Sequence, residues 1–283
     1  MARNFQKLGG YTPCTASLVE HVENDVEYGV RVFIRGQYGF QTSLEGTTAM
    51  VTPRFGIPAS ELPLETPIAV PLADGTTRNH TIIQHGNPES TFYDGTCDGV
   101  WILCDKIYEE RVWWASGSSG YLNSDIDIYL NGAYAERFHT GFQSMVKEVK
   151  IPYTAYVGLK TQIFSGADGL PRKHFLIAAY ETGLDHASDK PDDGKKLEYF
   201  LSGNDQAARE KRIAYFNGTA SSYWTRSPYI GDHQYTAIGV HETGGAAYAG
   251  RAELVGVRPV MILPNDLLLD PIPNPDGSYS PIL

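Results

Sequence analysis

Short runs of β-branched and aromatic residues predict a chain built largely from short strands. Apolar runs of strand length, bounded by Gly, Pro or Asn, occur at residues 30–34, 68–72, 80–86, 100–104 and 174–180. One loop separates the third run from the fourth, so we expect these two to pair in one sheet. The pattern therefore indicates a protein with substantial β structure.

Apolar residues at helical spacing occur in the middle of the chain. A later, highly charged segment is also predicted to be a helix. Ser124, followed three residues later by Asp127, forms the pattern of a capping box, with apolar residues at helical spacing behind it. The Asn-Gly pair at 131–132 weakens this stretch, so a second helix is expected to begin near Thr140. Both helices should bury one stripe against a sheet. Residues 204–214 are predicted to form a charged helix with a solvated face.

Two stiff apolar blocks near the C-terminus, residues 223–228 and 255–263, are predicted to act as a structural frame. Each block contains one arginine, Arg226 or Arg258, and the first also contains Trp224. An unpaired guanidinium in an apolar block would be costly, so each arginine should have a carboxylate or several carbonyl oxygens as partner. These frame residues are therefore interpreted as structural.

The segment between the two blocks is expected to display a binding surface. A short strand at 236–240 and a Gly-Gly turn at 244–245 divide it, which leaves aromatic and polar residues on turns and strand ends. Tyr and His offer a large, stiff contact area with a polar tip. The candidate ligand-binding residues are Tyr229, Asp232, His233, Gln234, Tyr235, His241, Tyr248 and Arg251. The alternative is an ordinary surface loop with its tyrosines partly in the core.

The composition divides the chain into three parts. Residues 1–75 are dense in Gly, Pro and Thr and are predicted to form a small β-rich module, an assembly arm, unless their strands join the main sheet. Residues 76–263 form the main domain, in which the charged run at 185–196 is expected to be an exposed loop. Pro259 should place the start of the last strand at a sheet edge or a bulge. The proline-rich tail, 264–283, is expected to be extended or disordered.

Charge and cysteine content argue against several functional classes. The 283 residues are 42% hydrophobic, enough for a core, and carry a formal net charge of −10. No basic stripe offsets that charge, so neither nucleic acid nor an anionic membrane is an expected partner. Cys14, Cys97 and Cys104 are interpreted as small buried thiols. No cofactor and no metal are expected, because His80 and His85 lack further ligands at a repeating spacing.

The sequence predicts neither an N-terminal signal peptide nor a membrane-spanning segment. The N-terminal residues contain no apolar run of signal-peptide length. No stretch of 18 apolar residues occurs either. We therefore expect a soluble protein that is made in the cytoplasm and leaves it, if it leaves at all, by assembly into a particle or by lysis.

The order of several motifs resembles one uncharacterised domain family. Between residues 82 and 263 the chain contains, in this order, HGNPESTFYDGTCDGVWIL, LNSDIDIYLNGAYAERF, YWTRSP and VGVRPVMIL. The family that these motifs resemble is formally of unknown function and is common in gut Firmicutes and in their phages and prophages. It has no known catalytic residue, and residues 1–75 lie outside the resemblance.

A more distant resemblance concerns the fold. A Trp-and-Arg block followed by a terminal Gly-aliphatic-Arg strand is similar to the formylglycine-generating-enzyme branch of the C-type-lectin-like fold, which includes tail-tip proteins that some phages diversify with a retroelement. This resemblance implies an α+β domain with two helices on a twisted, mostly antiparallel sheet. It also implies a binding face on the loops between Arg226 and Arg258. The chain has no cysteine after Cys104, unlike the enzyme branch, and lacks the calcium motifs of sugar-binding lectins.

Three functional hypotheses remain. The first is a non-enzymatic receptor-binding protein of a phage tail or particle surface, which binds a bacterial surface protein or glycan through loops 229–251. The second is a structural particle component without ligand binding. The third is an enzyme, although neighbouring acids such as Asp192 and Asp193 seldom converge on one bond and no Walker loop or Gly-x-Ser-x-Gly motif occurs. A homo-oligomer is expected, and trimers are frequent at tail tips.

Overall fold

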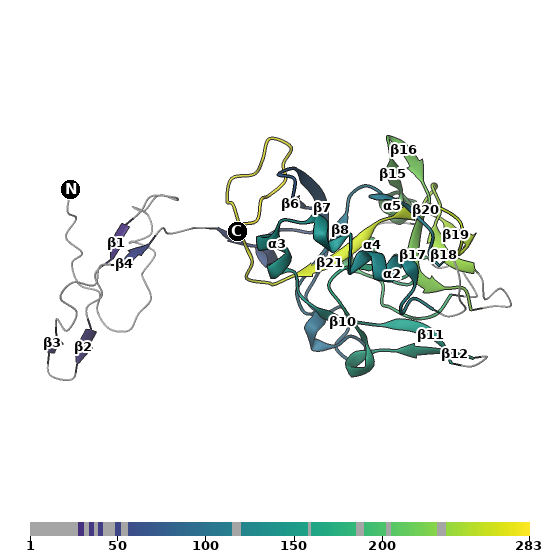
Figure 1. The fold of residues 1–283 in the computed structure, drawn as a ribbon, viewed down its shortest axis with the longest axis horizontal. Coiled ribbons are helices and arrows are strands. Elements are labelled where there is room, and N and C mark those ends of the chain that lie inside the picture. Colours follow the sequence, from purple (N-terminus) through teal and green to yellow (C-terminus); the bar gives the residue numbers. More distant parts are fainter. Residues whose placement is uncertain are drawn as a thin grey trace. The chain divides into compact units, whose positions relative to one another are not determined.

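The computed structural model divides into two compact units, Met1–Gly56 and Ile57–Leu283, and each is described by itself (Figure 1). The structure describes residues 56–114, 120–157, 160–184, 190–201, 205–230 and 236–283, together with the backbone of four strands before residue 56. The division falls after Gly56, not after residue 75, because the strand at 67–71 pairs within the second unit. The run predicted as a strand at 68–72 thus belongs to the second unit.

The first unit is described at four short strands. Strand β1 (Tyr28–Val30) pairs with β4 (Ala49–Val51), and β2 (Ile34–Gly36) pairs with β3 (Gly39–Gln41), both antiparallel. The single strand predicted over 30–34 falls partly on β1 and β2 and partly outside the described residues. These pairs agree with a β-rich N-terminal segment.

A five-stranded antiparallel sheet, the first sheet, contains two fully buried five-residue strands of the second unit. Its order β14–β21–β8–β7–β6 runs through Phe175–Leu176, Pro259–Leu263, Val100–Cys104, Thr77–His85 and Pro67–Pro71. The expected pairing of β7 with β8 is confirmed, since Ile82 lies opposite Ile102. All residues of β8 and β21 are buried, and Figure 1 shows β21 in yellow running through the unit. The first sheet therefore joins segments from both ends of the unit.

A second five-stranded sheet, the second sheet, carries most of the predicted frame. Its order β19–β18–β17–β20–β9 runs through Ala246–Gly250, Thr236–Val240, Tyr223–Pro228, Val255–Val257 and Glu109–Arg111. Strands β17 and β20 are parallel, and the other neighbours are antiparallel. The chain passes to the first sheet at Arg258. There β21 lies between β14 and β8, so the expected sheet edge is wrong; Pro259 is tolerated because it is the first residue of its strand.

Four two-stranded ribbons and four 3-10 helices complete the described part of the second unit. The ribbons pair β10 (Val149–Ile151) with β13 (Leu170–Arg172), β11 (Tyr153–Val157) with β12 (Lys160–Phe164), β15 (Ala214–Phe216) with β16 (Thr219–Ser221), and β5 (Ile57–Pro58) with β22 (Leu268–Leu269). The 3-10 helices are η1 (Ala59–Glu61), η2 (Gly95–Cys97), η3 (Ala135–Arg137) and η4 (Gly166–Asp168).

The α-helices of the described residues are short. They are α2 (Asp125–Leu130), α3 (Thr140–Met145), α4 (Glu198–Leu201) and α5 (Asp205–Arg212). The predicted cap of α2 is confirmed, because the Ser124 hydroxyl accepts a hydrogen bond from the Asp127 backbone N–H at 3.2 Å. The mixed α+β class is confirmed, with two five-stranded sheets in place of the single sheet that the resemblance implies. In the part of the chain described, none of the helices has the length and apolar character needed to cross a membrane.

The C-terminal tail is extended and packs on its own unit. Strand β22 pairs with β5. Ala69 of β6 donates its backbone N–H to the Tyr279 carbonyl oxygen, and Tyr279 donates its own to Pro67, both at 2.9 Å. Tyr279 thereby covers the outer side of β6, which lies at the edge of the first sheet. Of the two alternatives for the tail, the extended one is confirmed.

Two polar contacts overturn expectations for the segment after residue 173. The run at 174–180 forms only the two-residue strand β14 before the chain turns, because the Glu181 carboxylate accepts a hydrogen bond from the Ala178 backbone N–H at 2.8 Å. Within the run at 185–196, predicted as an exposed loop, Asp193 is fully buried. Its hydrogen bonds, given below, compensate for its burial.

The Ser124 cap generates a stability prediction. Replacing Ser124 by Ala removes the acceptor for the Asp127 N–H and should lower the free energy of unfolding by about 1 kcal/mol. Urea unfolding followed by circular dichroism measures the change. Ser144→Ala, at an exposed serine of α3, is the matched control and should change stability by less than about 0.5 kcal/mol. Equal losses in both variants would contradict the cap.

Candidate functional site

A buried ion pair joins Arg226, on β17 of the second sheet, to Glu181, in the turn that follows β14 of the first sheet. Neither side chain has any exposed surface, and two hydrogen bonds of 2.5 and 2.7 Å join the guanidinium to the carboxylate. The other three N–H groups donate to backbone oxygens of Pro152, Leu176 and Asp193, at 2.8, 2.9 and 3.2 Å. All five guanidinium N–H groups have an acceptor, which a buried arginine requires. The expected carboxylate partner of Arg226 is confirmed.

The Glu181 carboxylate is also fully engaged. Besides Arg226 and the Ala178 N–H, it accepts a hydrogen bond from the Tyr93 hydroxyl at 2.7 Å. That hydroxyl in turn accepts from the Lys195 backbone N–H at 2.8 Å. Burial alone would lower the pKa of Arg226, but the attraction of Glu181 outweighs it and raises that pKa. The Arg226 guanidinium therefore stays charged inside the protein.

A second buried carboxylate, Asp193, lies against this pair. It accepts hydrogen bonds from the Ser227 hydroxyl at 2.8 Å and the Thr154 hydroxyl at 3.3 Å. Burial raises the pKa of Asp193 to about 6, although Arg226 and the Ser227 hydrogen bond act in the opposite direction. Asp193 thereby ties the segment 190–201 to β11 and β17.

The other frame residues are buried and hydrogen-bonded as well. Arg258 is 4% exposed and donates to the Cys104 carbonyl at 2.8 Å and to the Tyr223 hydroxyl at 3.3 Å. One carbonyl and one hydroxyl thus serve Arg258, where a carboxylate or several carbonyls were expected. Trp224 is buried, and its indole N–H donates to the Arg111 carbonyl at 2.8 Å. The frame therefore fixes β17 against β9 and against the start of β21.

Three sequence-predicted site residues reach the surface, and together we name them the tyrosine face: Tyr229, His241 and Tyr248. Tyr248, on the edge strand β19, is 49% exposed. Its ring packs edge-on against that of Tyr229, just after β17, with centroids 5.5 Å apart. His241 is half-buried in the turn between β18 and β19, with Nδ1 2.9 Å from the Thr243 hydroxyl oxygen. One hairpin and the strand beside it thus hold the tyrosine face.

Arg251 does not belong to the tyrosine face. It is 3% exposed, and its guanidinium lies 5.4 Å from the centre of the Trp113 ring. Its carbonyl oxygen accepts the backbone N–H groups of Trp113 and Trp114 at 2.9 Å. This burial is the reverse of the exposure expected for a ligand-binding residue. The candidates that lie outside the described residues are Asp232, His233, Gln234 and Tyr235.

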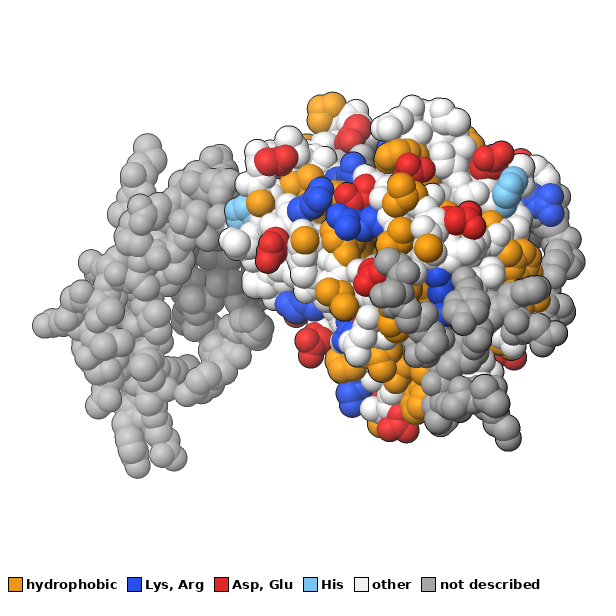
Figure 2. Space-filling view, turned by 45° about the vertical axis from the view of Figure 1, so that its right-hand side comes forward, with side chains coloured by type: hydrophobic (Ala, Val, Ile, Leu, Met, Phe, Trp, Pro, Cys, Tyr) orange, Lys and Arg blue, Asp and Glu red, His pale blue; other side chains and the backbone are white. Residues whose placement is uncertain are grey.

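Arginine and tyrosine side chains interlock on the surface near β9. The Arg111 guanidinium lies 3.6 Å from the centre of the Tyr129 ring and 2.6 Å from the Glu109 carboxylate. Arg137 donates to the Tyr108 hydroxyl at 3.2 Å. These cations are engaged by rings and a carboxylate. In agreement with such mixing, Figure 2 shows basic, acidic and apolar side chains interspersed over the described part of one face.

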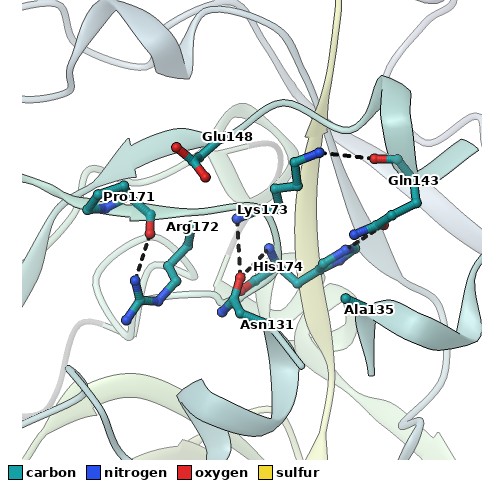
Figure 3. A pocket seen from close by; sticks show the side chains of 8 residues that line it. All are labelled: Asn131, Ala135, Gln143, Glu148, Pro171, Arg172, Lys173 and His174. Carbon is teal, nitrogen blue, oxygen red and sulfur yellow. Dashed lines mark hydrogen bonds between the residues drawn. The ribbon is translucent and has the colours of Figure 1, made fainter. Parts of the chain in front are cut away.

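A pocket of about 230 Å³ opens near α2 and α3, away from the residues predicted as a site (Figure 3). Its lining residues are Asn131, Ala135, Gln143, Glu148, Pro171, Arg172, Lys173 and His174. In Figure 3, Glu148, Pro171 and Arg172 lie at one end, and Gln143 and Ala135 lie at the other. Helices, a strand end and the loops between them therefore supply the walls.

Side-chain hydrogen bonds hold the floor of the pocket. The Asn131 carboxamide donates to the His174 carbonyl at 2.9 Å and accepts the backbone N–H groups of Lys173 and His174 at 3.3 Å. His174 is fully buried, with Nε2 2.9 Å from Gln143 Oε1. Burial lowers the pKa of His174 to about 3, so the imidazole is neutral near neutral pH.

Sequence reasoning missed the pocket and did not identify which acids pair with Arg172 and Arg226. Asp127 was interpreted only as a capping acid, yet it binds Arg172 through two hydrogen bonds of 2.6 Å, which raise the pKa of Arg172. Glu181 lies 45 positions from Arg226, and no local pattern connects them. The one feature of the sequence that could have pointed to the pocket is the run of Arg, Lys and His at 172–174, where β13 ends.

The described residues contain no group of three or more His, Cys, Asp or Glu that could hold a metal ion. Cys97 and Cys104 are free and buried, and burial raises the pKa of these thiols to about 12 and about 11. Their interpretation as buried thiols is confirmed, whereas Cys14 lies outside the described residues. Burial also lowers the pKa of His80, to about 4.

A family model described as a domain of unknown function, DUF6273, matches residues 98–265. The chain belongs to this family. The DUF6273 segment contains the ion pair, the tyrosine face and the pocket, whereas β6, β7 and residues 266–283 lie outside it. No curated protein and no solved structure matches the chain. The resemblance to a family of unknown function is confirmed, and its description assigns no activity.

Breaking the ion pair should strongly destabilise the DUF6273 domain. Arg226→Met leaves the Glu181 carboxylate buried without its cation and should lower the free energy of unfolding by about 3–5 kcal/mol. Urea unfolding measures the loss. The double variant Arg226→Met/Glu181→Met removes both charges and should lose less than the sum of the two single variants. Additive losses would contradict a direct contribution of the pair.

Asp193 should give the stability of the DUF6273 domain a pH-dependent term. Its pKa is raised in the folded protein to about 6 from an ordinary value of 3.8, so the folded state binds the proton more tightly. This contribution, about 3 kcal/mol, is fully present below about pH 4 and is lost as the pH rises through about 6.

Asp193→Asn isolates this term, because Asn does not titrate. The free energy of unfolding of the wild type, relative to the variant, should increase as the pH falls from about 8 to about 4. Urea unfolding at several pH values measures both proteins, and the comparison cancels the other acids. A difference that stays constant with pH would show that Asp193 does not take up this proton.

Proposed function

We propose that this chain is a non-enzymatic recognition protein that binds a bacterial surface protein or glycan through the tyrosine face. The observation that carries the proposal is the contact between the rings of Tyr229 and Tyr248, of which Tyr248 is 49% exposed. Tyr229 directly follows β17, the strand that carries the buried Arg226. Tyrosine gives large amphipathic contact area at a low cost in conformational entropy. The edge position of β19 leaves this aromatic pair at the side of the second sheet.

The rigidity of the base also supports recognition. Strand β17 carries Arg226 at its centre and pairs with β18, which pairs with β19. The ladder between β18 and β19 covers five residue pairs, from Thr236–Gly250 to Val240–Ala246. A surface whose backbone is already held loses less entropy on binding.

The finer parts of the proposal concern fold type and setting. We propose a C-type-lectin-like domain on a phage tail or particle surface, assembled as a homo-oligomer, with loops 229–251 as the displayed segment. The motif order and the Trp-and-Arg block support it, together with the mixed α+β architecture in which Trp224 and Arg226 are buried. A bacterial cell envelope is then the partner to test first.

The two alternatives receive less support from the same residues. As a purely structural component, the chain would use its tail between subunits, but Tyr279 and β22 hydrogen-bond within their own unit. An enzyme that used neighbouring acids would need them to converge. Asp193 is buried against Ser227, whereas Asp192 is exposed, so these two carboxylates do not share a site.

Tyr248→Ala should weaken binding to bacterial cell envelopes by about tenfold or more, since it removes an exposed aromatic contact and the packing of Tyr229. Pull-down of the labelled protein with envelopes of candidate hosts measures this. Tyr215→Ala, at a tyrosine that is also 49% exposed but lies on β15, is the matched control and should bind like the wild type. Envelope binding that is unchanged by Tyr248→Ala would remove the tyrosine face from the proposal.

A further inference from the structure

We propose that the pocket between Asn131 and His174 is a second binding site, which takes one ring of a neutral sugar. The proposal goes beyond the tyrosine face and shares no residue with it. Four properties of the pocket carry it: its volume, the fixed positions of its walls, its unused donors and acceptors, and the balance of its charges.

The volume limits the size of the ligand. At about 230 Å³ the pocket lies below the roughly 300–1,000 Å³ of pockets that enclose drug-sized ligands. A single six-membered ring with its hydroxyl groups suits that space, and an oligosaccharide would have to extend beyond it. Ala135 and Pro171 add apolar surface that the C–H groups of such a ring can cover.

The polar walls are held in place before any ligand arrives. The His174 ring stacks on Phe138, with 2° between the planes and 5.0 Å between the centroids. Asp127 fixes Arg172 through two hydrogen bonds, and the Asn131 carboxamide oxygen fixes the backbone of Lys173 by accepting its N–H. Groups that are already ordered lose little entropy when a small ligand binds.

Donors and acceptors remain unused on both sides of the pocket. Of the three N–H donors of Lys173, the structure uses one, towards the Gln143 carbonyl oxygen at 3.1 Å. The carboxylate of Glu148 is exposed and makes no hydrogen bond or ion pair with the residues described. A hydroxyl group both donates and accepts, so the hydroxyls of one ring can engage Lys173 at one point and Glu148 at another.

The charges of the lining favour a neutral ligand. Asp127 compensates Arg172, which leaves the cation of Lys173 and the anion of Glu148 to balance each other. His174 adds no charge, because it is neutral. An anion or a cation would therefore meet one like and one opposite charge in the same small space, so the lining gives neither of them a net electrostatic attraction that repays its desolvation.

Ligand-observed saturation-transfer NMR tests the proposal on the full chain. The probes are glucose, galactose, mannose and N-acetylglucosamine, with acetate and methylammonium as charged comparisons. We expect transfer to at least one sugar, with affinity about tenfold weaker in Lys173→Met because a donor is lost. Lys195→Met, at a lysine whose side chain is 40% exposed outside the pocket, is the matched control and should bind as the wild type does.

A second variant tests the position of the ligand. Ala135→Leu narrows the pocket without changing its charges and should abolish transfer, while the midpoint of unfolding shows that the domain stays folded. Transfer to none of the sugars overturns the proposal, as does transfer that survives both pocket variants or stronger binding of either charged probe. Sugar binding that is lost in Tyr248→Ala and kept in Lys173→Met would place the sugar on the tyrosine face and also overturn it.

Discussion

The buried pair of Arg226 and Glu181 is the constraint on which the second unit depends. One guanidinium, in the middle of the second sheet, reaches the backbone of three other segments, at Pro152, Leu176 and Asp193, and the Glu181 carboxylate in the second of them. Because each of its five N–H groups has its own acceptor, none of these segments can shift without leaving a buried donor unpaired. Asp193 extends the same network through two hydroxyl groups. Polar contacts in the core therefore set the mutual positions of elements far apart in the sequence.

This network explains how the domain combines a rigid central strand, β17, with the partly exposed rings of Tyr229 and Tyr248. The network fixes the position of β17 from the core side. The backbone hydrogen bonds from β17 to β18 and from β18 to β19 then fix the position of the strand that carries Tyr248. The edge-on contact with Tyr229 then settles the orientation of the ring. The position of these rings is thus imposed from the interior, and in the recognition role that we propose they would contact the partner.

The sequence was informative wherever structure depends on neighbouring residues. The cap at Ser124, the start of α3 at Thr140 and the strand at 236–240 follow from spacing rules, and all three are present. The need of Arg226 for a partner was also foreseeable from its apolar surroundings. The partner's identity was not, because Glu181 lies in a turn that no period marks. Asp193 was misread for the same reason, since its charged neighbours suggest solvent and its hydroxyl partners come from distant strands.

The contact of the C-terminal tail with the edge of the first sheet affects how the chain can fold during translation. Asn79 donates a hydrogen bond to Asp276 across 197 positions, and Tyr279 covers the outer side of β6 at residues 67 and 69, next to the hydrogen bond that the His139 N–H donates to the Pro71 carbonyl oxygen. During synthesis β6 emerges early, so the part of its edge that Tyr279 covers stays open until nearly all of the second unit has been translated. The first strand of the sheet to be synthesised is thus the last to be fully covered. For most of translation the nascent chain exposes unpaired backbone groups that could pair with another chain.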